Sequence, residues 1–93
     1  MKFQKIADTE KPTFCWDRNW SIAEIKKRLA QSDENERLSL MAWILREGTF
    51  AEIWTILLPS EVYAFLNRLT PFLGRRKEYW RYTFNAWHRL GKV

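Results

Sequence analysis

The chain has 93 residues, of which 46% are hydrophobic and 16% aromatic, including six Trp and six Phe. This composition excludes a disordered tail and allows one hydrophobic core, so a single domain is the expected organisation. The 16 Lys and Arg outnumber the 11 Asp and Glu, and the resulting net charge of +5 favours contact with polyanions without requiring it.

Several classes of protein are excluded or disfavoured by what the sequence lacks. Cys15 is the only cysteine, which excludes an internal disulfide framework and multi-cysteine zinc sites and indicates a cytoplasmic protein. The first residues contain no continuous apolar stretch of the kind found in signal peptides. The apolar run from Trp54 to Leu58 ends at Pro59, well short of the ~18–20 residues that a membrane helix needs. We therefore expect neither export nor a membrane span.

The chain begins with a segment that has no regular periodicity. Residues 1–13 mix charged side chains with Pro12 and show neither helical nor strand spacing. They are predicted to form a flexible arm in front of a single helical domain over 14–93.

Two capping signals open the first two predicted helices. A Ser-x-x-Glu pattern begins at Ser21, and apolar residues then recur every three or four positions, which predicts a helix over 22–31. Ser32 or Asp33 is expected to cap the next helix, whose apolar positions cover most of its circumference and indicate a buried central element. Gly48 is expected to end this helix in the left-handed conformation.

The middle of the chain predicts two further short helices. Thr49, with a glutamate three residues later, predicts the start of a third helix, and Pro59 is expected to stop it. Ser60 is expected to cap a fourth helix, whose apolar spacing continues to Leu69 and is broken by Thr70 and the proline after it.

The last predicted helix follows a loop around Gly74 and covers about 76–90, closed by Gly91. No segment shows sustained strand alternation between hairpin turns, and no internal repeat is present. The prediction is therefore an all-α fold, a single small orthogonal bundle of four to five short helices.

The last helix carries two predicted faces. Its core arc is expected to contain Tyr79, Trp80, Thr83, Phe84, Ala86, Trp87 and Leu90. Its opposite side carries a row with the spacing i, i+4, namely Lys77, Arg81, Asn85 and Arg89, with Glu78 and His88 beside it.

This row allows two interpretations. As a nucleic-acid-binding face, it would place Arg75 and Arg76 on phosphates and Arg81 or Asn85 at base edges. Alternatively, the row is the solvated side of an amphipathic helix in a basic protein. A helix-turn-helix around Gly48 is disfavoured because the third helix is apolar and has almost no basic or amide side chains.

Residues suited to catalysis or metal binding are scarce. His88 is the only histidine, so neither a His-paired nucleophile nor a multi-histidine metal site can be assembled. Cys15 lacks a nearby base in the sequence and is expected to act as a small hydrophobe. The three scattered glycines form no phosphate-binding loop. We expect no enzymatic activity, no catalytic residues, no metal and no cofactor.

The tryptophans fall into two groups. Four lie at apolar helical positions and are predicted to be in the core: Trp43, Trp54, Trp80 and Trp87. The other two, Trp16 and Trp20, are less constrained and are candidates for binding a protein partner.

A family resemblance is carried, in chain order, by Phe14-Cys15-Trp16-Asp17, by Trp43 to Thr49 with Trp54, and by Arg75-Arg76 with Tyr79-Trp80. Over about 14–80 the chain resembles an uncharacterised family of short bacterial helical proteins. In that family an aromatic-Trp-Asp opening precedes a helix that ends in a Gly-Thr or Gly-Asp turn, and a basic pair precedes an aromatic-Trp pair. Cys15 departs from the family's opening. Members are often encoded beside nucleotidyltransferase-type toxins, so the resemblance implies a partner or antitoxin role, but it identifies no binding residue.

The sequence therefore predicts a non-catalytic interaction module, a bacterial regulatory or antitoxin-like protein with a protein partner. The alternative prediction is nucleic-acid binding through the basic face of the last helix. The oligomeric state and the identity of the partner stay open.

Overall fold

The computed structural model describes residues 7–15 and 18–92, which contain six α-helices and no β-strand. The helices are α1 (Ile22–Gln31), α2 (Glu34–Glu47), α3 (Phe50–Ile56), α4 (Pro59–Ala64), α5 (Leu66–Leu69) and α6 (Lys77–Arg89). Two 3₁₀ turns, η1 (Thr70–Phe72) and η2 (Gly74–Arg76), join α5 to α6. The predicted all-α fold, a small helical bundle, is confirmed.

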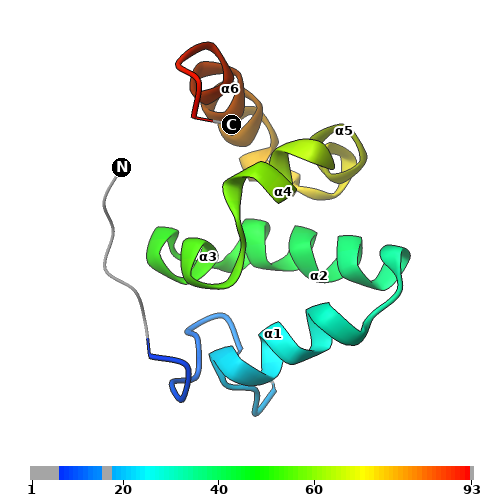
Figure 1. The fold of residues 1–93 in the computed structure, drawn as a ribbon, viewed down its shortest axis with the longest axis vertical. Helices are drawn as coiled ribbons and strands as arrows, with labels where there is room; N and C mark the ends of the chain where they lie inside the picture. Colours follow the sequence, from blue (N-terminus) through cyan, green and yellow to red (C-terminus); the bar gives the residue numbers. More distant parts are fainter. Residues whose placement is uncertain (1–6, 16–17, 93) are drawn as a thin grey trace.

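The helices stack around α2. Figure 1 shows α2 between α1 on one side and α4 with α5 on the other, while α6 lies beyond them and is seen nearly end-on. The axis of α6 therefore crosses that of α2 steeply. No helix among the described residues combines the length and apolar character needed to span a membrane.

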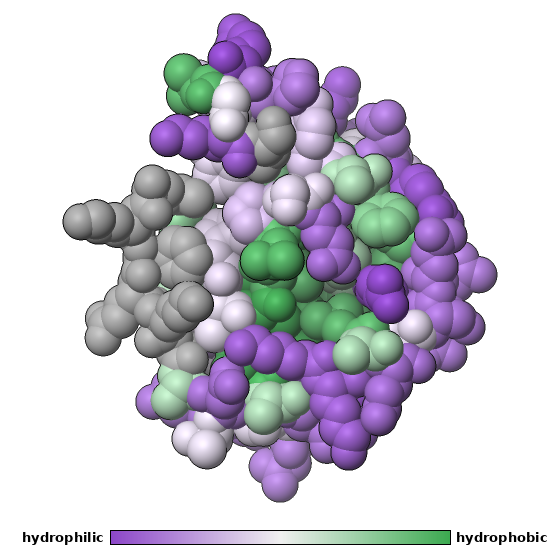
Figure 2. Space-filling model, in the orientation of Figure 1, coloured by the Kyte–Doolittle hydropathy of each residue, from purple (hydrophilic) through white to green (hydrophobic). Residues whose placement is uncertain are grey.

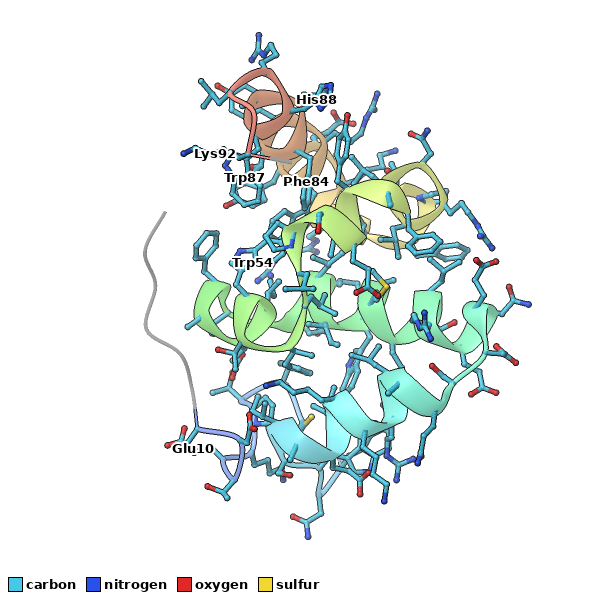
Figure 3. The ribbon with its side chains drawn as sticks, viewed as in Figure 1. Glu10, Trp54, Phe84, Trp87, His88 and Lys92 are labelled. Atoms are coloured by element: carbon cyan, nitrogen blue, oxygen red, sulfur yellow. The ribbon has the colours of Figure 1, made fainter. Side chains whose placement is uncertain are left out.

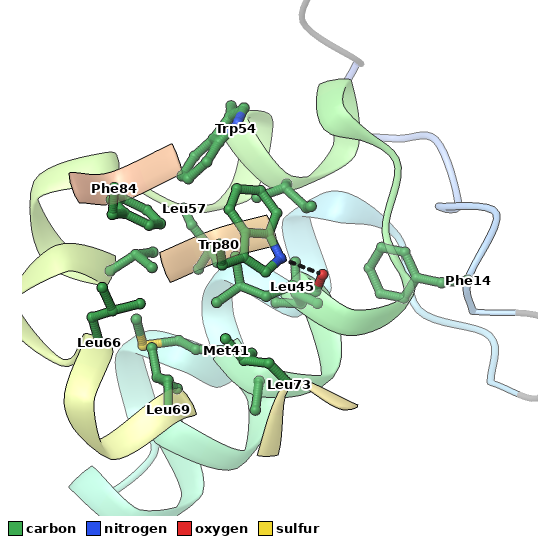
Figure 4. Packing of buried hydrophobic residues seen from close by; sticks show 14 of the residues in the cluster. Phe14, Met41, Leu45, Trp54, Leu57, Leu66, Leu69, Leu73, Trp80 and Phe84 are labelled. Atoms are coloured by element: carbon green, nitrogen blue, oxygen red, sulfur yellow. Dashed lines mark hydrogen bonds between the residues drawn. The ribbon is translucent and has the colours of Figure 1, made fainter. Parts of the chain in front are cut away.

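Aromatic and aliphatic side chains from all six helices form one core. Trp80 and Phe84 of α6 are almost fully buried and pack with residues of α2, α3 and α5, as Figure 4 shows. Trp54 of α3 is 4% exposed, and its ring centroid lies 5.7 Å from that of Trp80 and 6.1 Å from that of Phe84. The edge-on geometry of these ring pairs stabilises the packing of α3 against α6.

The capping predictions that depend on local sequence are confirmed. Ser21 Oγ accepts a hydrogen bond from the Glu24 amide at the start of α1. Asp33, not Ser32, caps α2 by accepting from the backbone N–H three residues later. Thr49 and Glu52 form the reciprocal capping box at the start of α3.

Gly48 follows the last residue of α2 as predicted, but the predicted left-handed conformation is wrong. Its φ is −78°, so it does not take the left-handed conformation. A Cβ at this position would lie 2.8 Å from the Ile44 carbonyl oxygen and 3.1 Å from Cγ1 of Ile53. Glycine is needed here because a Cβ would meet both the last turn of α2 and the Ile53 side chain of α3. Gly74 and Gly91, by contrast, have positive φ angles of 58° and 75°.

The fourth predicted helix is two helices, and Ser60 does not cap it. Pro59 begins α4 after Leu58, because proline fits the first helical position, where no N–H is required. At Phe65, with φ −106° and ψ 10°, the backbone N–H bonds to Val62 instead of continuing the α-helical pattern. The chain then re-enters a helix as α5.

The core arc of α6 is narrower than predicted. Trp80 and Phe84 are buried, and Trp87 packs against the core. Tyr79, at 51% exposed, and Leu90, at 71%, were expected to face inward and do not. Tyr79 lies about 100° around the helix from Trp80, and Leu90 follows the last helical residue, so neither position reaches the core.

The described part of the predicted arm contacts the helical body. Glu10 and Asp8 accept backbone hydrogen bonds from the start of α1, and Pro12 is buried. Cys15 is fully buried, in agreement with its predicted role as a small hydrophobe. Residues 1–6 lie outside the described residues, and the boundary at residue 13 stays a prediction.

Glu52 of α3 is hydrogen-bonded to the N-terminal segment at Thr13. The residue is 2% exposed, and its carboxylate accepts hydrogen bonds from the Thr13 amide, the Thr13 hydroxyl and the Thr49 amide. Burial raises the pKa of the Glu52 carboxyl, but the hydrogen bonds from Thr49 and Thr13 lower it by more, so the pKa lies below its ordinary value of 4.5. The folded protein therefore favours the ionised carboxylate.

Glu52→Gln is expected to destabilise the protein in a pH-dependent way. Because the pKa is lower in the folded state, the carboxylate stabilises the fold above about pH 4.5, and this contribution is lost as the pH falls through the folded pKa. The variant should lose about 1–3 kcal/mol of unfolding free energy at pH 7 and clearly less at pH 3, measured by urea unfolding. An equal loss at both pH values would contradict this role.

Candidate interaction surface

A groove lies between the start of α3 and the start of α6. It has a volume of about 420 Å³. Its walls include Thr49, Phe50, Ile53, Arg75, Tyr79 and Trp80. Phe50, at 37% exposed, and Tyr79 leave large apolar surfaces open to solvent on either side of it. We call this feature the α3–α6 groove.

A second, smaller hollow lies at the other end of α6. It has a volume of about 240 Å³ and is lined by Pro59, Trp87, Leu90 and Lys92. Figure 3 shows Trp54 of α3 directed toward Phe84 and Trp87 of α6, with Lys92 near Trp87. We call this feature the C-terminal hollow.

Trp54 connects the two features. Its ring centroid lies 6.1 Å from that of Phe50 and 5.7 Å from that of Trp80, both of which line the groove. It also lies 5.6 Å from that of Trp87, which lines the C-terminal hollow. The buried ring of Trp54 therefore links the groove to the C-terminal hollow, and we call the groove, Trp54 and the hollow together the aromatic track.

The two buried indole N–H groups of this region differ in their partners. Trp80 Nε1 donates a hydrogen bond of 3.1 Å to the Leu45 carbonyl at the end of α2 (Figure 4). Trp54 Nε1 is buried and has no acceptor among the described residues. An unsatisfied buried donor costs about 1–3 kcal/mol, so the aromatic track contains a donor that an added acceptor would stabilise.

Arg75 and Arg76, predicted as a functional pair, have different environments. Arg76 is half-buried, and its Nη1 donates to the carbonyl oxygens of Leu45 at 3.1 Å and Gly48 at 2.7 Å. It therefore satisfies carbonyls at the C-terminus of α2. Arg75 is exposed and lies at the edge of the α3–α6 groove. Only Arg75 is free to contact a ligand.

The basic row of α6 is exposed as its spacing predicts, at Lys77, Arg81, Asn85 and Arg89. Arg81 Nη1 lies 3.4 Å from Glu78 Oε1, so part of its charge is already compensated. Arg75, Lys77 and Arg89 form no ion pair with the described residues. We call Arg75 together with the exposed row the basic face. It faces solvent, unlike Arg76.

Of the two predicted partner-binding tryptophans, the structure describes Trp20, which does not line the groove or the C-terminal hollow. Trp20 is half-buried, and the guanidinium groups of Arg18 and Arg28 lie 4.9 Å and 4.0 Å from its ring centroid. Its ring also packs edge-on against Trp43. Because cations and the core cover much of this ring, Trp20 offers less apolar surface than the aromatic track. Trp16 falls outside the described residues.

One further apolar area is visible on the face shown in Figure 2, where hydrophobic side chains gather within a hydrophilic rim. A hollow of about 280 Å³ lies where α1, the end of α3 and α4 meet. Its rim contains Lys26, Arg37 and Glu61, which carry both signs of charge. It therefore has no clear electrostatic preference for a partner.

Potential catalytic and metal-binding side chains are not brought together. Among the residues that the structure describes, no three His, Cys, Asp or Glu side chains form a group able to hold a metal ion. His88 is exposed, as expected, and stacks on Tyr63 with a centroid distance of 5.1 Å. The absence of enzymatic activity stays a prediction.

Comparison with known proteins adds no functional assignment, because no family model, no curated protein and no solved structure matches this chain. The resemblance to a bacterial family stays a prediction. Function must therefore be inferred from the surface itself.

Proposed function

We propose that this protein is a non-catalytic interaction module that binds another protein through the aromatic track and the cations beside it. The observation that carries the proposal is the exposure of large side chains along α3 and α6. Phe50, Tyr79 and Leu90 are 37%, 51% and 71% exposed, although each contains a large apolar group. Tyrosine, tryptophan and arginine are the residues that most often dominate the binding energy of protein interfaces. Exposed apolar surface rimmed by charges is typical of such sites.

The finer proposal is a bacterial regulatory or antitoxin-like partner in the cytoplasm. The family resemblance over 14–80 supports the antitoxin-like role, with a nucleotidyltransferase-type toxin as the protein bound. The single buried cysteine, Cys15, accords with a reducing compartment.

Site-specific photo-crosslinking tests the proposed function. A photoreactive p-benzoylphenylalanine in place of Tyr82, which is 73% exposed on α6, is expected to give a defined adduct with one protein in the native host. The same group in place of Asn67, an exposed residue of α5, serves as the matched control and should give none. Tyr79→Ala should reduce the Tyr82 adduct about tenfold, because it removes an interface anchor.

The partner is identified from the adduct by mass spectrometry. Equal adducts from both positions, or an adduct that Tyr79→Ala leaves unchanged, would contradict binding through the aromatic track.

Nucleic-acid binding through the basic face is a second candidate function. The specific observation in its favour is that Arg75, Lys77 and Arg89 are exposed without an ion-pair partner among the described residues. Arg76 has no part in this candidate because α2 holds its guanidinium.

A salt titration tests this candidate. Affinity for a short DNA duplex, measured by fluorescence anisotropy, should fall with salt with a logarithmic slope of about −0.9 per neutralised phosphate. The double variant Arg81→Ala, Arg89→Ala should weaken binding and reduce that slope by up to about two phosphates. Binding that this variant leaves unchanged would exclude the basic face.

A further inference from the structure

A cationic side chain lies at each end of the aromatic track. Arg75 lies at the edge of the α3–α6 groove, and Lys92 lines the C-terminal hollow. Neither side chain forms an ion pair with the described residues, and no carboxylate of those residues lines the groove or the hollow. The track therefore attracts negative charge at two separated points.

The part of the track between these cations is apolar and contains one unused donor. The groove presents Phe50 and Tyr79, and the C-terminal hollow presents Trp87 and Leu90. Trp54 Nε1, which is buried between them and has no acceptor in the part of the chain that the structure describes, is suited to a carbonyl oxygen. An extended peptide has free carbonyl groups along its length, whereas a helix uses most of its own.

We propose that the aromatic track binds an extended, acidic peptide segment of the partner protein, an inference that rests on the proposed protein-binding function. Two apolar side chains of the segment occupy the groove and the C-terminal hollow. A carboxylate at each end pairs with Arg75 and Lys92. A backbone carbonyl of the segment accepts from Trp54 Nε1, a buried atom that side-chain movement on binding must first uncover.

The length of the track fixes the length of the segment. α6 has 13 residues and is about 20 Å long at 1.5 Å per residue. An extended peptide covers that distance with about six residues. The segment is therefore short, about six residues, with its two apolar side chains between its two acids.

Charge and composition disfavour three other candidates for binding to the aromatic track. A second copy of this chain would bring a net charge of +5 to a positive site. Residues 1–6 of the chain carry Lys2 and Lys5, which have the same sign as Arg75 and Lys92. A nucleic acid supplies phosphates but no aliphatic groups for the hollows.

Peptide display tests the proposal with a defined probe. Random peptides of about twelve residues, twice the length that spans the track, are selected against the full chain and counter-selected against the Tyr79→Ala, Arg75→Glu double variant. The expected peptides share two apolar residues flanked by Asp or Glu. One such peptide is then synthesised, and its affinity is measured by isothermal titration calorimetry.

The variants separate the three proposed contacts. Arg75→Glu and Lys92→Glu should each weaken peptide binding about three- to tenfold, and Tyr79→Ala by about tenfold or more. Trp54→Phe keeps an aromatic ring but removes the donor, and it should weaken binding about three- to tenfold. Lys27→Glu makes the same charge change at an exposed position on α1 and should alter affinity less than about twofold. Thermal unfolding verifies that each variant is folded.

Several outcomes overturn the proposal. They are the enrichment of no peptides, the selection of neutral or basic peptides, and a Lys27→Glu effect as large as that of Arg75→Glu. Displacement of the peptide by single-stranded DNA would assign the track to nucleic acid. Self-association that Tyr79→Ala abolishes would assign it to a second copy. Peptide binding that requires removal of residues 1–6 would assign it to the chain's own N-terminal segment.

Failure of this inference is distinguishable from failure of the proposed function. If the Tyr82 photo-crosslink to a partner persists in Arg75→Glu and Trp54→Phe, protein binding stands and the acidic extended segment is wrong. If no position on α6 gives a crosslink, the proposed function itself is wrong.

Discussion

The carbonyl groups at the C-terminus of α2 hold the start of α6 against α2. The Leu45 carbonyl accepts hydrogen bonds from Trp80 Nε1 and from Arg76 Nη1, and the Gly48 carbonyl accepts a second bond from Arg76. These carbonyls have no partner within their own helix, and one of them satisfies the N–H of Trp80, which is 1% exposed. One set of contacts therefore caps α2, buries Trp80 and fixes the start of α6 beside the start of α3. The α3–α6 groove exists because of this placement.

The same contacts determine which side of α6 packs in the core and which side faces solvent. Trp80 and Phe84 face the core, so the helix cannot rotate without exposing them. Tyr82 and Arg89 are consequently held in solvent, and Tyr79 is held at the edge of the groove. A rigid helix that presents aromatic and basic side chains loses little conformational entropy on binding. This arrangement supports the proposal of an interaction module.

Features encoded by local sequence were predictable, whereas those set by packing were not. The Thr49–Glu52 capping box and the end of α6 before Gly91 depend on a few neighbouring residues, and the sequence predicts both. The break at Phe65 is not indicated by the helical spacing, and the close contact at Gly48 involves Ile53 of α3 as well as the last turn of α2. The basic row could be predicted from helical spacing, but nothing local distinguishes Arg76, held by α2, from Arg75. The aromatic track was missed because α3 supplies half of it and α6 the other half.

The most direct test of this account is the free energy of unfolding of Arg76→Ala compared with that of Arg75→Ala. The two arginines are neighbours, and each substitution removes one positive charge and the same side chain. Arg76→Ala is expected to lose about 1.5–3 kcal/mol, because it leaves carbonyls at the end of α2 without their charged donor, while Arg75→Ala stays within about 0.5 kcal/mol of the parent protein. Equal losses from the two substitutions would contradict the central role of the α2 C-terminus.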